Sequence, residues 1–338
     1  MSDASITARA VRPRLGFLGV GWIGRHRMER IAESGAADVA MICDSSAVIR
    51  AEAGKAAPDA KLACDFDELL EARLDGIVIA TPSALHAEQS IRALQAGLAV
   101  FCQKPLGRTA DEVASVVRAA ETADRLLGVD LSYRFTEGMQ RIRSAILNDE
   151  IGNVYACELV FHNAYGPDKP WFYDARLSGG GCVMDLGVHL VDLALWALDR
   201  PQVTNVSSRL FAGGQPLNGT PGQVEDYATA TLDLSSGVVA QIACSWKLSV
   251  GCDAIISATF HGSRGGLMLR NVDGSFYDFV AEQFCGTSRR ILATPPDAWG
   301  GRAAVAWATR LASDRRFDPE IRNVIQVAKV LDAIYGRC

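Results

Sequence analysis

The sequence has no uninterrupted apolar run that approaches the roughly 20 residues of a membrane-spanning helix. It also has no cluster of basic residues, because its 34 Lys and Arg are scattered among 39 Asp and Glu, for a net charge of -5. A nucleic-acid groove or an anionic membrane surface would require a basic stripe. We therefore expect neither a nucleic acid nor a membrane as a partner.

Cysteine spacing gives no sign of a disulfide framework or a zinc site. The nine cysteines are odd in number, form no Cys-x-x-Cys pair and fall mostly within apolar, strand-like runs. Such residues are typical of buried free thiols in a reducing compartment. The segment 1–14 has arginines but no apolar stretch behind them to make a signal peptide. We expect a cytoplasmic protein.

The composition supports two cores, since 49% of the 338 residues are hydrophobic and 22% are charged. From 15 to 132, short continuous apolar runs such as "DGIVIATP" and "LAVFCQ" alternate with helical stretches. Continuous apolar runs suit strands that are buried on both faces of a parallel sheet. We predict an N-terminal α/β domain with a doubly wound parallel sheet over residues 13–132.

After about residue 133 the strand-like runs become longer and alternate apolar with polar residues, as in "DYATATLDLS" and "VYACELVFHN". A long helical stretch at about 180–198 precedes most of them, and helical patterns return at about 301–314 and 319–335. Alternation with tight glycine turns favours antiparallel pairing. We predict a second, α+β domain over 133–338 with a large, mainly antiparallel open sheet.

A glycine pattern, Gly19-x-Gly21-x-x-Gly24, lies where the first apolar strand ends and a helix begins. Glycines in this place permit positive φ and let the backbone approach a pyrophosphate at the helix N-terminus. We predict that these glycines, with Trp22 and Ile23 of the first helical turn, bind a dinucleotide. The alternative is that they only make a sharp strand-to-helix turn.

Asp44 lies 20 residues after Gly24, just past the second predicted strand. A carboxylate there accepts hydrogen bonds from an adenosine ribose diol and repels a 2′-phosphate. Asp44 therefore favours NAD over NADP, and Arg50 is the nearest basic residue that argues for NADP. The alternative is that Asp44 caps the next element.

Two further polar groups of residues lie at the carboxyl ends of predicted strands, where open α/β sheets bind ligands. Thr81, Pro82 and His86 follow one strand, and Gln103 and Lys104 follow the next. Lys104 precedes a proline, which holds it in extended geometry. We predict that all five contact the cofactor. The alternatives are a solvent-facing His86 and an ordinary surface lysine.

In "GGGCVMDLGVHLVD", Asp185 and His189 lie four residues apart on one helical face, which Asp192 continues. Oxidation of a secondary alcohol requires a base for the hydroxyl proton, and the pKa of histidine suits that role near neutral pH. The Lys104 ammonium near the same oxygen would stabilise alkoxide charge. The alternatives are a helix-surface pair or half of a metal site. No third ligand with metal spacing is visible, so we expect no metal.

With these motifs the sequence resembles, along nearly its whole length, the family of glucose–fructose oxidoreductase, inositol dehydrogenase and rhizopine-catabolism proteins. The match consists of the glycine pattern at 19–24, Ala80-Thr81-Pro82 with His86, Lys104-Pro105, "YRF" at 133–135, and Gly179-Gly180-Gly181-x-x-x-Asp185-x-Gly187-x-His189. The resemblance implies a Rossmann domain followed by an α/β domain whose open sheet often forms the oligomer interface. We therefore expect a homodimer or homotetramer built through that sheet.

The resemblance also implies roles for individual residues. Lys104, Asp185 and His189 match the family's catalytic lysine, aspartate and histidine. His189 would be the base, Lys104 would polarise the substrate oxygen, and Asp185 would bind substrate. The bond between Lys104 and Pro105 is often cis in relatives, as a bond preceding proline permits.

The chain departs from the family pattern at Gln103, where relatives commonly have glutamate. Glutamine can hydrogen-bond nicotinamide or Lys104 but carries no charge, so Lys104 loses an anionic neighbour that would raise its pKa. Because the catalytic residues remain, we predict an active NAD-dependent dehydrogenase for a secondary hydroxyl of a sugar, polyol or cyclitol. Two alternatives stay open: a glycoside hydrolase that retains NAD, and a catalytically silent NAD-binding sensor.

The segment 163–178, "NAYGPDKPWFYDARLS", combines aromatic and hydrogen-bonding side chains. Aromatic faces pack on the C–H surfaces of sugars, and polar groups bind the hydroxyls. The candidate substrate contacts are Tyr165, Asp168, Lys169, Trp171, Tyr173 and Arg176 in this segment, with Tyr133 and Arg134 at the junction between the domains. The alternative is a loop that packs only on its own domain.

Overall fold

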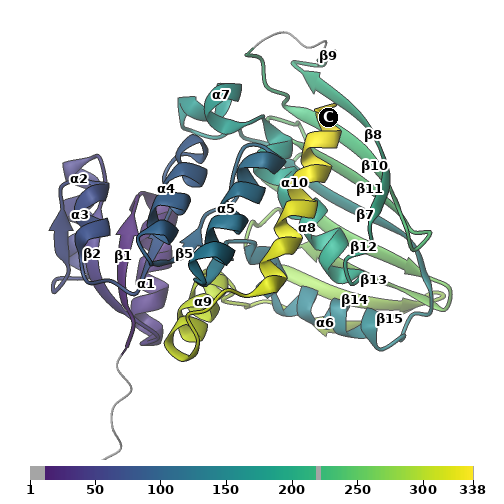
Figure 1. Cartoon of the computed structure of the whole chain (residues 1–338). Helices are drawn as coiled ribbons and strands as arrows, with labels where there is room; N and C mark the ends of the chain where they lie inside the picture. Colours follow the sequence, from purple (N-terminus) through teal and green to yellow (C-terminus); the bar gives the residue numbers. More distant parts are fainter. Residues whose placement is uncertain (1–11, 218–221, 338) are drawn as a thin grey trace, which may run out of the picture.

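The structure, a computed structural model, describes residues 12–217 and 222–337. Its N-terminal part is a six-stranded parallel sheet with strand order β3-β2-β1-β4-β5-β6, seen on the left of Figure 1. The strands are β1 (Arg14–Leu18), β2 (Asp38–Cys43), β3 (Lys61–Ala63), β4 (Gly76–Ile79), β5 (Ala99–Cys102) and β6 (Leu127–Val129). The helices are α1 (Trp22–Ser34), α2 (Ala47–Ala56), α3 (Phe66–Glu71), α4 (Ser83–Gln95) and α5 (Ala110–Ala123).

The parallel arrangement follows from the helices that connect the strands, since each returns the chain to the same edge of the sheet. β4 and β5 are buried at every residue, which explains their uninterrupted apolar sequences. The strand order reverses between β1 and β4. This reversal opens a crevice at their carboxyl ends, where doubly wound sheets bind dinucleotides. The predicted Rossmann-type sheet is confirmed.

The second part is a nine-stranded sheet with order β15-β14-β13-β12-β7-β11-β10-β8-β9. Its neighbouring strands are antiparallel except for β7 and β11, which run parallel, so the predicted mainly antiparallel sheet is also confirmed. The strands are β7 (Val154–Asn163), β8 (Val203–Ala212), β9 (Gln215–Pro216), β10 (Tyr227–Leu234), β11 (Val239–Ser245), β12 (Ala254–Gly262), β13 (Gly265–Asn271), β14 (Phe279–Cys285) and β15 (Ser288–Ala293). The remaining helices are η1 (Ser132–Phe135), α6 (Glu137–Leu147), η2 (Pro170–Tyr173), α7 (Ala175–Ser178), η3 (Val183–Gly187), α8 (Val188–Ala197), α9 (Arg302–Ser313), η4 (Pro319–Arg322) and α10 (Asn323–Ile334).

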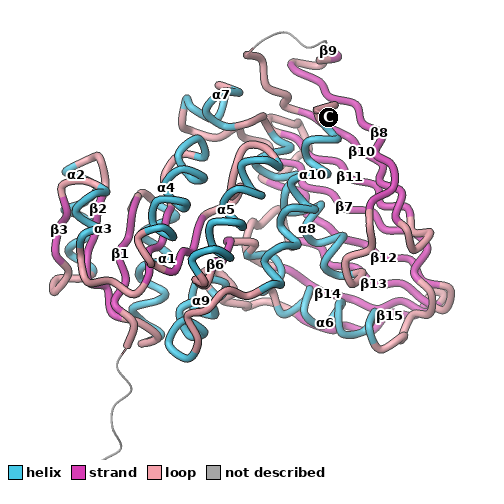
Figure 2. The backbone as a smooth tube through the Cα atoms, in the orientation of Figure 1, coloured by secondary structure: helices cyan, strands magenta, loops and turns pink. Residues whose placement is uncertain are grey.

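Helices cover one face of the nine-stranded sheet, as Figure 2 shows. β10 alternates half-buried and buried residues along its whole length, so one of its faces lies in the core. α8 and α10 contact strands of this sheet, and α10 also contacts α5 of the first part. The two sheets are therefore joined through a shared helical layer.

Helix α9 packs on the N-terminal sheet, although its residues fall within the predicted second domain, 133–338. It contacts α1, β5 and β6, and the ring of its Trp307 lies 5.6 Å from that of Phe101 in β5. A β-carbon at Gly76 would lie 2.9 Å from the indole, and one at Gly128 would lie 2.7 Å from it. The glycines thus leave the space that the indole fills, and the C-terminal part of the chain completes the first core.

The helical stretch Ala175–Ala197 is long and apolar enough to cross a membrane by length and composition alone. Its apolar window is 94% buried inside the protein, however. All residues of α8 within this stretch are buried. This stretch, which comprises α7, η3 and α8, therefore lies mostly in the core of the fold.

The eight cysteines among the described residues are free thiols, and Cys338 lies outside those residues. The buried ones are Cys43, Cys102, Cys157, Cys182 and Cys244; Cys252 is half-buried, and Cys64 and Cys285 are exposed. Burial raises the pKa of Cys43 to about 11 and that of Cys102 to about 12. Thiols with such pKa values are poor nucleophiles.

We expect Trp307→Ala to lower the free energy of unfolding by about 3–5 kcal/mol, because it leaves a cavity between α9 and the sheet. Trp22→Ala, at a side chain that is 72% exposed, should change it by less than about 0.5 kcal/mol. Urea unfolding followed by circular dichroism measures both. Equal effects of the two substitutions would contradict the assignment of α9 to the first core.

Candidate active site

A cavity of 1310 Å³ opens between the two parts of the molecule. One wall consists of the glycine turn after β1 and of residues that follow β2, β4, β5 and β6. The other wall consists of η3, the start of α8, and residues within 161–172 and 276–300. The volume exceeds the roughly 300–1,000 Å³ of a typical small-molecule site, so it can hold a dinucleotide and a second molecule.

The glycine turn has the geometry of a pyrophosphate site. Gly19 has a φ of 82°, and a β-carbon there would lie 2.7 Å from the backbone of Ala80. A β-carbon at Gly24 would lie 2.0 Å from the carbonyl oxygen of Gly19, so Gly24 lets α1 approach β1. A β-carbon at Gly21 would have no neighbour within 4 Å. Packing therefore does not require Gly21, and its bare backbone leaves room for a ligand.

Gly21, Trp22 and Ile23 line the cavity at the N-terminus of α1. No side chain caps this end of the helix, and its first turn contains no acidic residue. Its first backbone N–H groups are therefore available to an anion, which the helix dipole also favours. These residues fit the pyrophosphate of a dinucleotide.

Asp44 follows β2 and lines the cavity. Its two carboxylate oxygens accept hydrogen bonds from the backbone N–H groups of Val20 and Ser46, both at 2.9 Å. Each oxygen retains lone-pair capacity for a ribose hydroxyl. Arg50 is not among the lining residues, and its guanidinium donates to the backbone carbonyl oxygen of Asp44 at 2.8 Å. The arrangement fits NAD better than NADP.

Lys104, after β5, meets Asp185 of η3 across the cavity. Lys104 Nζ donates to Asp185 Oδ1 and to the carbonyl oxygen of Asp185, both at 2.7 Å. The second carboxylate oxygen accepts a hydrogen bond from Trp246 Nε1 at 3.1 Å. Because an ammonium has three N–H bonds, one remains for a ligand oxygen. The peptide bond between Lys104 and Pro105 is cis, as the resemblance implies.

His189 is buried at the start of α8 and lines the same cavity. Its ring contacts that of Tyr133 edge to face, with the centroids 4.8 Å apart. Burial, and then the positive charges of Lys104 and Arg27, lower the pKa of His189 well below its ordinary value. The imidazole is therefore neutral at neutral pH, as a base must be.

The backbone that connects Asp185 to His189 is not the regular α-helix that their spacing predicts. Residues Val183–Gly187 form a π-helical turn, a distortion that is frequent at functional sites. Asp185 and His189 nevertheless both line the cavity. Asp192, predicted on the same face, pairs instead with Arg134 outside the cavity lining.

Glu225 holds the start of this distorted helix and was missed by the sequence analysis. Its carboxylate accepts hydrogen bonds from the N–H groups of Gly181 at 3.0 Å and Val183 at 2.9 Å. Tyr335 Oη donates to the same carboxylate at 2.7 Å. Glu225 thereby fixes the segment that positions Asp185.

His86 holds two cavity segments together and does not face solvent. Its ring nitrogens lie 2.7 Å from the carbonyl oxygens of Thr81 and Pro105, and burial lowers its pKa. Thr81, Pro82 and His86 all line the cavity. A neutral ring donates to one of these two carbonyl oxygens, and the other oxygen lies against the second ring nitrogen. His86 can therefore contact a cofactor only through its ring surface.

Gln103 donates from Nε2 to Asp130, the residue directly after β6. Arg27 of α1 donates from Nε to the same carboxylate oxygen at 2.6 Å, and all three side chains are buried. A glutamate at 103 would oppose Asp130 with a like charge, so glutamine fits this place as a donor. Lys104 does not lack an anionic partner, since it pairs with Asp185.

Four of the predicted substrate residues, Tyr133, Asp168, Lys169 and Trp171, line the cavity. Trp171 stacks on Phe172, with the ring centroids 3.8 Å apart and 21° between the planes. This part of the wall therefore combines an aromatic surface with a carboxylate and an ammonium.

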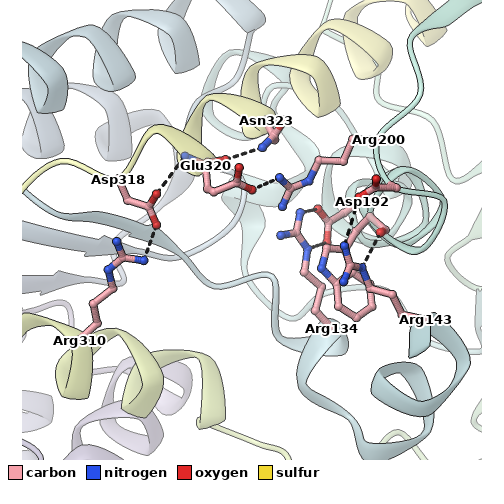
Figure 3. A network of polar contacts seen from close by, with 10 residues as sticks. Arg134, Arg143, Asp192, Arg200, Arg310, Asp318, Glu320 and Asn323 are labelled. Carbon is pink, nitrogen blue, oxygen red and sulfur yellow. Dashed lines mark hydrogen bonds and ion pairs between the residues drawn. The ribbon is translucent and has the colours of Figure 1, made fainter. Parts of the chain in front are cut away.

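Arg134, Tyr165 and Arg176, which the sequence also predicts as substrate contacts, are not among the residues that line the cavity. Arg134 makes a two-armed ion pair with Asp192, its Nε lying 2.7 Å from Oδ2, within the polar network of Figure 3. Tyr165 and Arg176 are exposed and bind neighbouring aspartates. Tyr173 borders a separate, smaller pocket.

Arg27, Asp130, Glu225 and Trp246 were all missed by the sequence analysis. Asp130 carries a usable signal, because it follows an apolar strand-like run just as Asp44 and Gln103 do. The others carry none, since their importance depends on partners far away in the sequence.

These features define a class of protein: a dinucleotide-binding domain joined to a sheet domain, with lysine, carboxylate and imidazole groups where the two meet. Residues 13–131 match the model of the oxidoreductase family with an NAD-binding Rossmann fold, and residues 139–268 match the GFO/IDH/MocA C-terminal domain. Rhizopine catabolism protein MocA of Rhizobium meliloti is 30% identical over 93% of this chain and 99% of its own. The chain therefore belongs to the GFO/IDH/MocA family of NAD-binding oxidoreductases.

Two further similarities concern named dehydrogenases. D-Glucoside 3-dehydrogenase of Escherichia coli (strain K12) is 28% identical, over 60% of this chain and 60% of its own. The solved structure of levoglucosan dehydrogenase in complex with NADH has a TM-score of 0.83 at 20% identity and covers 96% of both chains. The latter similarity establishes a common fold.

We expect Asp44→Ala to raise the dissociation constant for NAD about 10- to 100-fold, because it removes charge-assisted hydrogen bonds to the ribose. Its preference for NAD over NADP should narrow at the same time. The matched control is Asp59→Ala, at an exposed position. Quenching of tryptophan fluorescence on titration measures both constants. Unchanged affinity in Asp44→Ala would contradict the proposed ribose contact.

Proposed function

We propose that this oxidoreductase uses NAD to oxidise a secondary hydroxyl of a sugar, polyol or cyclitol, or runs the reverse reduction. The observation that supports this most strongly is the convergence of Lys104, Asp185 and His189 on the cavity that also contains the glycine turn. The cluster supplies a cation for the substrate oxygen, a neutral base and a carboxylate that holds the cation.

In the oxidation, the oxygen of the substrate hydroxyl accepts a hydrogen bond from the remaining N–H of Lys104, and His189 takes the hydroxyl proton. The hydrogen on the same carbon leaves with its electron pair as hydride, and a carbon–oxygen double bond forms. NAD, when bound, supplies the hydride acceptor. Lys104 stabilises the negative charge that develops on the oxygen. Asp185 keeps Lys104 in place.

The substrate class is supported by the wall opposite the glycine turn and by the relatives. Trp171 offers an aromatic surface for ring C–H groups, and Asp168 and Lys169 offer groups for hydroxyls. The named relatives include dehydrogenases for a glucoside and for levoglucosan. We propose a ring hydroxyl of a glycoside or cyclitol as the reacting group.

We further propose a cytoplasmic homodimer or homotetramer that associates through the outer face of the nine-stranded sheet, with neither nucleic acid nor membrane as a partner. Tyr227, Val160 and Ile255 are half-buried or exposed on the side opposite the helices. The net charge of -5 and the scattered basic residues support the expected absence of nucleic acid. Light scattering after gel filtration would test the oligomer.

The two alternatives raised by the sequence, a glycoside hydrolase that retains NAD and a silent sensor, are not supported by the comparisons. The silent sensor was suggested by Gln103, and the hydrogen bond from Gln103 to Asp130 removes that reason. Incubation with NAD and a panel of inositols, hexoses, pentoses, sugar acids and glycosides distinguishes all three functions. Formation of NADH would support the dehydrogenase. Release of a sugar without NADH would support the hydrolase, and binding of NAD without any product would support the sensor.

We expect His189→Asn to lower kcat about 100- to 10,000-fold, since it removes the base and retains a side chain of similar size. The dissociation constant for NAD should change little. His261→Asn, at a partly exposed histidine of β12, is the matched control. Initial rates of NADH formation give kcat. Near-normal turnover in His189→Asn would exclude His189 as the base.

The lowered pKa of His189 predicts how activity depends on pH. A histidine must be neutral to act as a base. Because the pKa of His189 lies well below the ordinary histidine pKa of 6.5, its imidazole is still neutral at pH 6.5. The oxidation rate should therefore fall only as the pH drops through this lowered pKa. The pH profile of kcat/KM measures this, and histidine NMR titration of the wild type against His189→Asn assigns the group. An acid limb centred at or above pH 6.5 would contradict a buried neutral base.

A further inference from the structure

Asp130 carries a buried carboxylate oxygen without a partner. It follows β6, lines the cavity and is 1% exposed. Oδ2 accepts hydrogen bonds from Arg27 Nε, at 2.6 Å, and from Gln103 Nε2. Among the described residues, no group donates to Oδ1.

A buried carboxylate oxygen without a donor is energetically unfavourable, so a ligand with an N–H or O–H group is expected there. Arg27 and Gln103 fix the orientation of the carboxylate before any ligand binds. Arg27 also balances its charge, so the cluster is neutral overall. A neutral, oriented acceptor selects for hydrogen-bond geometry and not for net charge.

The place of Asp130 along the sheet edge identifies the ligand. Asp44 follows β2, the glycine turn follows β1, Lys104 follows β5, and Asp130 follows β6, the last strand in the order. A dinucleotide whose adenosine ribose lies at Asp44 and whose pyrophosphate lies at the glycine turn directs its nicotinamide half toward β5 and β6. At that end its donors are the carboxamide NH2 and the ribose hydroxyls.

We propose that Asp130 Oδ1 accepts a hydrogen bond from the carboxamide NH2 of bound NAD. The inference rests on the NAD-dependent function proposed above. The carboxamide is attached to the ring carbon next to the hydride-accepting carbon, so fixing it fixes which face of the ring meets Lys104 and His189. Asp130 is therefore a residue that orients the cofactor, with Arg27 and Gln103 as its positioning residues.

The test compares three ligands by isothermal titration calorimetry: NAD, its 3-acetylpyridine analogue, in which a methyl group replaces the carboxamide NH2, and ADP-ribose, which lacks nicotinamide. The wild type should bind NAD about 10- to 100-fold more tightly than the analogue. In Asp130→Asn the amide oxygen must accept from Arg27 and Gln103, so the preference should shrink to less than about 3-fold. ADP-ribose affinity should stay within about 2-fold, which also shows that the variant is folded.

Asp44→Asn is the matched control. It should weaken all three ligands together and keep the preference of NAD over the analogue. Asp130→Ser serves in place of Asp130→Asn if that variant does not bind ADP-ribose.

Other results overturn the inference. Equal binding of NAD and the analogue by the wild type, or a full preference in Asp130→Asn, would show that Asp130 only completes an internal ion pair. Loss of ADP-ribose affinity in both Asp130 variants, with circular dichroism spectra that match that of the wild type, would assign the contact to a ribose hydroxyl. Failure of the wild type to bind either NAD or ADP-ribose would instead contradict the proposed function itself.

Discussion

The ion pair between Lys104 and Asp185 joins the end of β5, in the first sheet, to η3 of the second domain. Both side chains are about four-fifths buried, with exposures of 19% and 18%, so the cost of desolvating two charges must be offset by their mutual contacts. Lys104 donates hydrogen bonds to both the carboxylate and the carbonyl oxygen of Asp185, and Trp246 donates one to the second carboxylate oxygen. These contacts offset the desolvation cost. The site is therefore assembled only where the two domains meet.

The other buried charges around the site follow the same rule. Asp130 is held by Arg27, Asp192 by Arg134, and Glu225 by two backbone N–H groups and Tyr335. Each contact joins segments far apart in the sequence. These contacts form a polar frame around His189, whose lowered pKa leaves its imidazole neutral and able to accept a proton. Within this frame, Asp130 Oδ1 has no hydrogen-bond partner among the described residues, and Asp130 lines the cavity where β6 ends.

The sequence predicts those parts of the fold and site that depend on local pattern. Apolar runs identify the parallel strands, alternation identifies the large sheet, and the spacing of Gly19, Gly21 and Gly24 identifies the turn. It does not predict that α9 returns to the first sheet, because Trp307 fills space left by Gly76 and Gly128 on distant strands.

The sequence also does not reveal which hydrogen-bond or ion-pair partners engage the polar side chains of the site. Arg134 and Arg176 look like substrate ligands in the sequence, yet each is engaged by an aspartate. Residue spacing does not predict the π-helical turn before His189 either, since the start of this helix is held by hydrogen bonds from its backbone N–H groups, including that of Gly181, to Glu225. From the sequence, Gln103 is only a position where the negative charge of the family's glutamate is missing. The structure shows that its amide donates a hydrogen bond to Asp130.

In the proposed oxidation, a carbon-bound hydrogen of the substrate passes as hydride directly to NAD in the cavity between the domains. The most direct measurement uses the first substrate found to be active, deuterated at the carbon that bears the reacting hydroxyl, with mass spectrometry of the reduced cofactor. Direct hydride transfer predicts that the deuterium is recovered on the nicotinamide ring of the NADH formed. Unlabelled NADH, with the deuterium released to water, would contradict it.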